Sequence, residues 1–356
     1  YEAVLKDAGA ASNAYTSDDL TAYHTTFSKE DLEKILAMEA DRFQNLEYSE
    51  SVFRTEALAV LGEYNKNSAS PTSKLNEAMR NTAFDSHTYK HTTMGFLKDI
   101  EDMPNQFEYS RQFFDRYYRP EYTTIVVAGD LRPQQVRAMV EKYWGKWERG
   151  NWKPPIPAEP AQKAARTAHL DWPSATLPWV VVAYKSAPYS DTEKDQAALD
   201  LISFIGFSEN SELYQRLVVE QQKVDELELY NPDRVDPKLF TAFARVKKQA
   251  DMKDVEEQIL STINGFKDTL VRADKLSAAK KRLRYQFALG MNNSEAIART
   301  VASYVALRRT PETINRVYDL YASLTPDDLR NVARKYFGEN NRTIVTLTGP
   351  KQETDR

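Results

Sequence analysis

The sequence predicts an α+β fold of two domains with like architecture, each a mainly antiparallel sheet packed with helices. A chain of 356 residues is long enough for two domains that each bury a core. Residues 117–126 and 336–345 share a helix end, a short turn and a β-rich strand at a constant offset of 219 residues (336 − 117). A proline-rich segment lies between these copies. Chance similarity of two helix–strand units is the alternative to a true repeat.

The proline-rich segment sets the expected domain boundaries. Prolines favour extended backbone and suit a spacer between domains. We therefore expect a first domain over residues 1–150, a linker over residues 151–166 and a second domain over residues 167–356.

Composition excludes several classes of protein. The formal net charge is −4 with mixed signs and no basic block, so neither nucleic acid nor an anionic membrane is an expected partner. The absence of cysteine removes disulfides, thiolate metal sites and a cysteine nucleophile. No apolar run approaches the roughly 18 residues of a membrane span. The chain starts at Tyr1 without a signal-like segment, so we expect a processed or truncated chain.

Local patterns predict the helices and strands. Strands alternate β-favouring residues between turn residues, and helices repeat apolar residues at a spacing near 3.6. In the first domain we expect strands 10–16 and 20–27, helices 28–43, 50–66, 73–82 and 105–118, strand 122–128 and helix 133–147. In the second we expect strands 177–185, 224–230, 239–247 and 341–349, helices over 191–220, and four or five helices before the last strand.

The helix over residues 50–66 carries two carboxylates in an unusual place. Glu56 and Glu63 are seven residues apart and so fall within roughly 20° of each other on one helix face. Apolar residues such as Val52 and Val60 flank them, so the pattern predicts that both face a core. A buried carboxylate needs a proton or a partner. A metal ion, a histidine or an arginine could serve, and pairing at a domain interface is the plainer alternative.

The four histidines form no convincing metal motif by themselves. His87 and His91 are four residues apart, but the surrounding sequence predicts a loop, and no glutamate between them could act as a base. We expect them to tether the loop or lie at the surface. His24 on a predicted strand and His169 near the linker are expected to be structural.

The order of several motifs resembles the pitrilysin/insulinase family of inverted-zincin metallopeptidases, in its processing-peptidase-like, two-domain bacterial type. The similarity covers essentially the whole chain and is strongest over residues 1–150. It comprises the strand motif Gly9-Ala-Ala-Ser-Asn-Ala-Tyr-Thr16, the spacing Arg54-x-Glu56-x(6)-Glu63, and the ending Tyr118-Arg-Pro-x-Tyr122 followed by Gly129-Asp130. The resemblance implies that the two domains together form one half of a clam-shell chamber.

The resemblance also implies roles for particular residues. Glu63 would be the third zinc ligand beside two histidines, and Glu56 would orient one of those histidines through its ring N–H. Four consecutive residues match the edge strand on which substrate peptides lie, where recognition runs through the backbone: Asn13, Ala14, Tyr15 and Thr16. An ordinary edge strand, paired elsewhere in a sheet, is the alternative.

The sequence departs from the family pattern at two places. The His-x-x-Glu-His motif, which supplies two zinc ligands and the general base, does not occur in these 356 residues. In the family it precedes the position of Tyr1, so we expect the remaining ligands upstream. Arg216 falls where an Arg–Tyr pair in the opposite half of the chamber supplies the arginine, but Lys223 stands at the tyrosine position.

The resemblance implies a zinc-dependent endopeptidase that cleaves peptides or unfolded segments within a closed chamber. The chain as given, with one expected ligand, should be inactive. The competing hypothesis is a zinc-free partner or core subunit of the same family that binds peptide or completes the chamber. We expect a homodimer or a heterodimer with a second family subunit. The bacterial periplasm is favoured over the cytoplasm.

Overall fold

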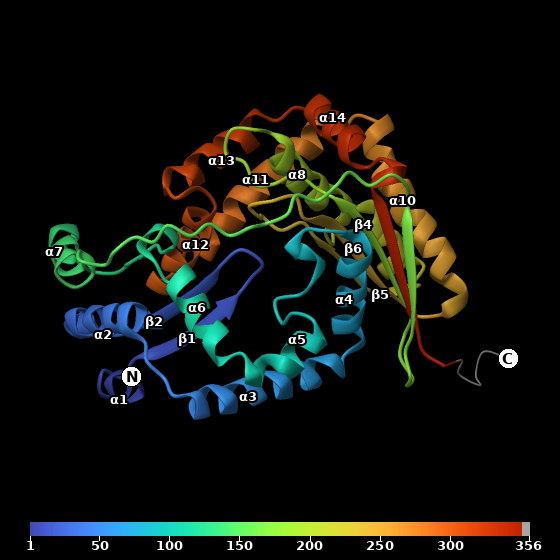
Figure 1. Ribbon diagram of the computed structural model, residues 1–356. Coiled ribbons are helices and arrows are strands. Elements are labelled where there is room, and N and C mark those ends of the chain that lie inside the picture. Colours follow the sequence, from blue (N-terminus) through green and yellow to red (C-terminus); the bar gives the residue numbers. More distant parts are fainter. Residues whose placement is uncertain (351–356) are drawn as a thin grey trace. The chain divides into compact units, whose positions relative to one another are not determined.

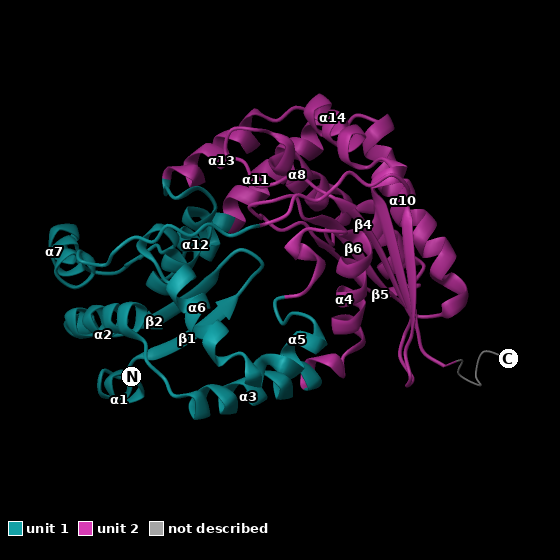
Figure 2. Ribbon diagram, in the orientation of Figure 1, with its two compact units in different colours: residues 1–65, 93–155, 287–311 teal, residues 66–92, 156–286, 312–356 magenta. Residues whose placement is uncertain are grey.

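The structure is a computed structural model in which residues 1–350 are described. The chain forms two compact units, shown in separate colours in Figure 2. Unit 1 comprises residues 1–65, 93–155 and 287–311, and unit 2 comprises residues 66–92, 156–286 and 312 onward. Both units combine strands with helices, and this α+β class is the expected one.

A five-stranded sheet organises unit 2 (Figure 1). Its strand order is β3-β7-β4-β6-β5, with β3 parallel to β7 and every other pair antiparallel. The strands are β3 (Arg166–Asp171), β4 (Trp179–Lys185), β5 (Val224–Tyr230), β6 (Leu239–Val246) and β7 (Arg342–Thr348). The mainly antiparallel sheet agrees with the expected fold of the second domain.

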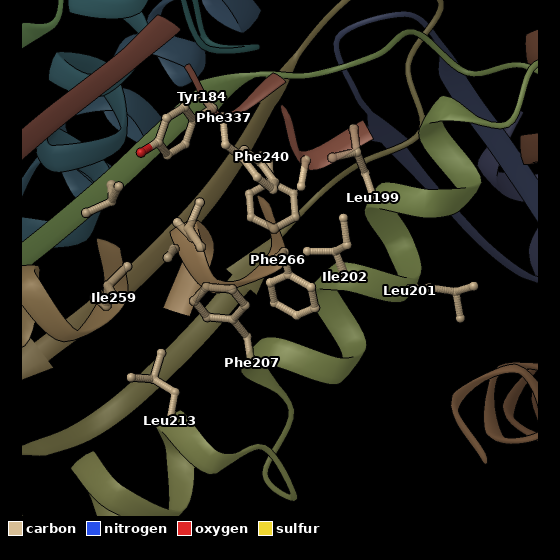
Figure 3. Close-up of a cluster of buried hydrophobic side chains, with 14 of the residues drawn as sticks. Tyr184, Leu199, Leu201, Ile202, Phe207, Leu213, Phe240, Ile259, Phe266 and Phe337 are labelled. Atoms are coloured by element: carbon tan, nitrogen blue, oxygen red, sulfur yellow. The ribbon is translucent and has the colours of Figure 1, made fainter. Parts of the chain in front are cut away.

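One face of this sheet packs against helices through a large aromatic and aliphatic core. Alternate residues of β4, including Val180, Val182 and Tyr184, point into it together with Phe240 and Phe337. Figure 3 shows these rings meeting the buried face of α8. The helices of unit 2 that pack around this core are α8 (Asp195–Phe207), α9 (Glu212–Tyr214), α10 (Met252–Asp268), α11 (Ala273–Gly290), α13 (Glu312–Ser323) and α14 (Pro326–Tyr336).

The opposite face of the sheet is covered by α4 (Pro71–Ala83). Leu75 and Met79 of α4 pack in one cluster with Trp179 and Val181 of β4. Because both faces are covered, six consecutive residues of β4 are buried. This explains why β4 reads as a continuous apolar run rather than an alternating one.

The compact units therefore differ from the expected division at 1–150 and 167–356. Residues 66–92 group with unit 2 because α4 packs on its sheet. Residues 287–311 group with unit 1 because α12 (Ser294–Arg308) packs on β2 (Thr21–Thr26). The boundary between residues 155 and 156 falls inside the expected linker 151–166. The division into two homologous domains stays a prediction.

Unit 1 is built from helices and one hairpin. The hairpin joins β1 (Ala11–Thr16) and β2 (Thr21–Thr26), which confirms the two predicted strands. Its helices are α1 (Glu2–Asp7), α2 (Leu32–Asn45), α3 (Glu50–Ser68), α5 (Leu97–Asp102), α6 (Phe107–Tyr117), α7 (Pro133–Trp144) and α12 (Ser294–Arg308). Unit 1 takes all of these except the last turn of α3.

One strand prediction was wrong, and one strand was missed. Residues 122–128 form no strand: a short 3₁₀ turn ends at Tyr122, and the following residues pair with no strand in the described structure. A β-rich sequence becomes a strand only where a neighbour pairs with its backbone. Conversely, β3 lies at the end of the expected linker and was not predicted. It becomes a strand by pairing with β7, in which Thr343 lies opposite Arg166, 177 residues later (343 − 166).

The proline-rich segment forms no helix or strand before Arg166, and its position is fixed by hydrogen bonds. The Glu159 carboxylate accepts hydrogen bonds from the backbone N–H groups of Asp85, Ser86 and His87 at 2.9–3.1 Å. It also pairs with Lys185 at 2.7 Å. Burial would raise the pKa of Glu159, but these four donors lower it to about 2. The segment is thus fixed to unit 2 at its centre.

Among residues 1–350, none of the helices has the length and apolar character that crossing a bilayer requires.

Candidate functional site

The helix α3 carries both glutamates of the expected metal site on an exposed face. Glu56 and Glu63 are exposed, whereas the buried side chains of the helix are Ala57 and Tyr64, one position further along. Neither glutamate has a hydrogen-bond or ion-pair partner in the described structure. The expectation that this face meets a core was therefore wrong for these residues, because the helix buries its neighbouring face instead.

The apolar neighbours of the two glutamates are covered only in part. Val52 is 52% exposed, a high value for an aliphatic side chain, whereas Phe53 and Val60 are half-buried. The helix thus presents carboxylates and apolar groups together to solvent.

The residues present do not fit a zinc site. A zinc ion held by protein needs at least three nitrogen, sulfur or oxygen ligands that converge on one point. Residues 1–350 hold no group of three or more histidine, cysteine, aspartate or glutamate side chains that could bind a metal ion. Glu63 can contribute one ligand, and no metal-dependent step can be derived from these residues.

The histidines tether loops and strands, as expected. His87 accepts the N–H of Tyr89 at Nδ1 (3.0 Å), and its Nε2 lies 3.2 Å from Asp236 Oδ2. His91 Nδ1 lies 2.8 Å from the carbonyl of Thr92. His169 on β3 bonds to Thr346 of β7 at 2.7 Å. None of these imidazoles points to a shared metal position.

The predicted peptide-binding strand lies at an edge. β1 pairs only with β2, so the outer side of β1 has no strand partner among residues 1–350 (Figure 1). Asn13, Ala14 and Thr16 are exposed, and Tyr15 is half-buried. An unpaired edge offers N–H and C=O groups to an extended peptide. Asn13 Oδ1 accepts the N–H of Ala14 at 2.8 Å, so the side chain satisfies one backbone donor of this strand.

The hairpin is held firmly from one face. Tyr23 of β2 packs edge-on against Phe43 of α2, and the Arg42 guanidinium lies 4.4 Å from the Tyr23 ring centre. The hydroxyls of Tyr23 and Tyr118 share a hydrogen bond. Burial, and then this bond, raise the pKa of Tyr118. Such aromatic packing gives β1 a rigid support, which is what a binding edge requires.

Arg216 is tied within unit 2. It lies in the π-helical turn Gln215–Glu220, and its Nε donates to Gln258 Oε1 at 2.7 Å. Lys223, seven residues later, pairs with Asp254 at 2.8 Å. The assignment of Arg216 to substrate binding stays a prediction, and its own contact shows only that it is held by α10.

A largely half-buried polar cluster in unit 2, with Gln196 buried at its centre, was not predicted. Asp200 Oδ2 accepts the hydroxyl of Tyr321 at 2.6 Å, and its Oδ1 accepts the Asn231 amide at 2.8 Å. The Gln196 amide lies 3.3 Å from Asp233 Oδ1 and 3.5 Å from Asp200 Oδ1. Burial, followed by the Asp233 carboxylate, raises the pKa of Asp200 to about 8. These residues come from distant segments, so no local sequence signal could have found them.

Comparison with known proteins identifies the family and the fold. The model for the insulinase family, peptidase family M16, matches residues 1–96, and the model for the M16 inactive domain matches residues 106–283, which is half of the chain. The zinc protease PqqE of Helicobacter pylori is 26% identical over 352 residues, which are 98% of this chain and 78% of that protein.

Solved structures show the same fold. The crystal structure of a protease from Helicobacter pylori has a TM-score of 0.89 at 26% identity, covering 98% of this chain and 83% of that chain. The periplasmic protease PqqL from Escherichia coli has a TM-score of 0.76 at 15% identity, covering 97% of this chain and 40% of that chain. With the M16 inactive-domain model spanning half of its residues, this chain belongs to the M16, or insulinase, family of peptidases.

Proposed function

We propose that this chain supplies the peptide-binding edge and one zinc ligand of an endopeptidase that cleaves peptides or unfolded segments in a closed chamber. The observation that carries the proposal is the exposed outer edge of β1, fixed from behind by the packing of Tyr23. An extended peptide added to this edge is recognised through its backbone, which suits substrates of varied sequence. The similarity to a protein named zinc protease supports the same reading.

Glu63 is the proposed zinc ligand and Glu56 the residue that orients a ligand histidine. Their exposure and lack of partners leave both carboxylates available. The remaining ligands and the general base have to come from residues that this sequence does not contain. This chain by itself is therefore expected to bind peptide without hydrolysing it.

Hydrogen exchange tests the binding edge directly. Amides of residues 11–16 should exchange more slowly when the chain is saturated with an unstructured peptide of about twenty residues, since the peptide pairs with β1. A matched peptide with alternate backbone nitrogens methylated keeps its side chains but loses the N–H groups that would donate hydrogen bonds to β1. Three lost hydrogen bonds should weaken binding at least tenfold. Unchanged exchange over residues 11–16 at saturation would refute the proposed function.

Zinc content tests the role of Glu63. In a form of the protein that holds zinc, Glu63→Gln should lower the metal content measured by atomic emission. Glu50→Gln on the same helix, where Glu50 pairs with Arg54, is the control. Zinc content unchanged by Glu63→Gln would remove this residue from the metal's ligands.

A zinc-free partner subunit is the second candidate function. The match of residues 106–283 to the model of the M16 inactive domain supports it. A partner subunit that binds peptide needs neither glutamate, so Glu56→Gln with Glu63→Gln should leave both zinc content and the activity of the assembled enzyme unchanged. A loss of either favours the endopeptidase.

A second family subunit and a periplasmic location complete the proposal. The PqqL chain, of which this chain covers 40%, is long enough to hold two such halves, which supports pairing with another half. The same protein is named periplasmic, which supports that compartment. Sedimentation of the purified chain should show a homodimer, or a heterodimer once a second family subunit is added.

A further inference from the structure

A groove of about 480 Å³ lies within unit 1 beside the hairpin. Its walls come from β1 and from α12, two segments far apart in the sequence. The residues that matter here are Tyr15, Asn293, Glu295, Arg299, Thr300 and Ser303. All but one lie on α12 or at its N-cap, and Tyr15 belongs to the edge strand.

α12 packs against the hairpin face that carries Tyr15. In the β1–β2 pairing, Asn13 lies opposite His24 and Tyr15 opposite Ala22. Side chains two residues apart on a strand share a face, so Asn13, Tyr15 and His24 point to the same side. His24 Nδ1 lies 3.4 Å from Glu295 of α12. The other face belongs to Tyr23 and its aromatic neighbours.

The Arg299 guanidinium is the cation of the groove. It lies 5.4 Å from the ring centre of Tyr15 and 3.5 Å from Glu295. The Glu295 carboxylate is also within 3.4 Å of both His24 and Thr26. The Glu295 carboxylate is thus shared among His24, Thr26 and Arg299. The Arg299 side chain remains 49% exposed. The guanidinium keeps donors that can bind a further carboxylate.

The two faces of the hairpin differ in how far their arginine side chains are exposed to a ligand. On the opposite face the Arg42 guanidinium is stacked on Tyr23 and paired with Glu39, and only 20% of its side chain is exposed. A peptide paired with β1 alternates its side chains between the two faces. Peptide residues on the α12 side therefore meet a more accessible guanidinium than those on the Tyr23 side.

The geometry points to a subsite for an acidic side chain, formed by Arg299 over the Tyr15 ring. A peptide residue directly opposite Tyr15 has its Cβ about 5 Å away, within reach of the guanidinium for aspartate or glutamate. Asn293, Thr300 and Ser303 line the remaining polar wall. This inference rests on the proposed binding of peptides along β1. It adds a preference for an acidic residue at the one peptide position opposite Tyr15.

A peptide scan tests the subsite. A set of unstructured fluorescent peptides carries one aspartate, moved one position at a time, and a matched set carries asparagine instead. Fluorescence anisotropy measures their binding to the whole chain. Aspartate should bind about fivefold tighter than asparagine at the position facing Tyr15 and equally well at the positions on either side of it. The preference should weaken as salt is raised.

Variants identify the residue responsible. Arg299→Gln should abolish the preference, and Arg299→Lys should keep part of it. Arg137→Gln, an exposed arginine of α7, changes the net charge equally and should leave it intact. Circular dichroism checks that each variant is folded, and Arg299→Lys keeps the test informative if Arg299→Gln is not.

The outcomes separate the subsite from the proposed function. If no peptide of either set binds, the proposal that peptides bind along β1 is wrong, and the proposed subsite is wrong as well. Binding without a difference between aspartate and asparagine overturns the subsite alone. A preference that survives Arg299→Gln, or that appears equally at neighbouring positions, also overturns it.

Discussion

Replacing Asp200 by asparagine should change how the stability of unit 2 depends on pH. The Asp200 carboxyl accepts hydrogen bonds from Tyr321 and Asn231 and stands close to a second acid through the shared Gln196 amide. Burial and the neighbouring Asp233 raise its pKa from an ordinary 3.8 to about 8. Asparagine has a similar shape and carries no charge; its Oδ1 can accept the Asn231 amide while its Nδ2 donates to the Tyr321 hydroxyl oxygen.

The sign follows from proton linkage. Because the folded-state pKa is raised, the folded protein keeps a proton on Asp200 that the unfolded chain releases above about pH 4. Unfolding becomes easier by about 1.4 kcal/mol for each pH unit in this window. Burial also raises the pKa of Asp233, so the two carboxyls titrate as a pair, and the loss between pH 5 and pH 7, on the order of 3 kcal/mol, is shared between them. Asp200→Asn removes the part of that loss that comes from Asp200.

Urea unfolding at pH 5, 6 and 7, followed by far-UV circular dichroism, measures the effect. We expect the variant to be close to the wild type at pH 5 and more stable at pH 7. Asp319→Asn removes an exposed carboxylate from α13, the helix that carries Tyr321, and controls for net charge. A pH dependence that is the same in wild type and Asp200→Asn would show that Asp200 is ionised in the folded protein.

Two further changes test other parts of the fold. Glu159→Ala should destabilise unit 2 by about 3 kcal/mol at pH 7 in urea unfolding, since three backbone donors and Lys185 lose their acceptor. Because the pKa of Glu159 is lowered to about 2, the difference from wild type should shrink as pH falls below about 4.5, and a constant difference would contradict this. Gly206→Ala should lower the melting temperature, because a Cβ there would lie 2.9 Å from the Phe266 ring. At Gly265 an added Cβ would meet open space, so Gly265→Ala should raise the melting temperature through helix propensity worth about 1 kcal/mol. Equal changes of melting temperature in the two variants would refute the steric explanation for Gly206.

Local pattern was sufficient for most of the helices and strands. The hairpin β1–β2, the strand β5 and the helix α3 lie where turn residues and apolar spacing predict them. The family motifs were equally local, because a short motif such as residues 9–16 is recognised from the identity and spacing of adjacent residues. Both kinds of signal depend on neighbours within a few turns of the chain.

The predictions that failed concern strand pairing and helix coverage, which depend on residues far apart in the sequence. The β-rich residues 122–128 stay unpaired, whereas β3 becomes a strand only through β7. Periodicity located Glu56 and Glu63 on one helix face but could not say which face is covered. Periodicity records which residues share a face, and coverage depends on elements elsewhere in the chain.

The sequence alone determined the family, the α+β class, the edge strand at Asn13–Thr16 and the absence of a complete zinc-binding motif, because each is written in neighbouring residues. Tertiary structure decided that α4 covers the sheet of unit 2, that Asp200 and Asp233 meet, and that Arg299 lies over Tyr15 although 284 residues (299 − 15) separate them. Such contacts arise from packing between remote segments, which burial and backbone pairing select and local sequence does not record.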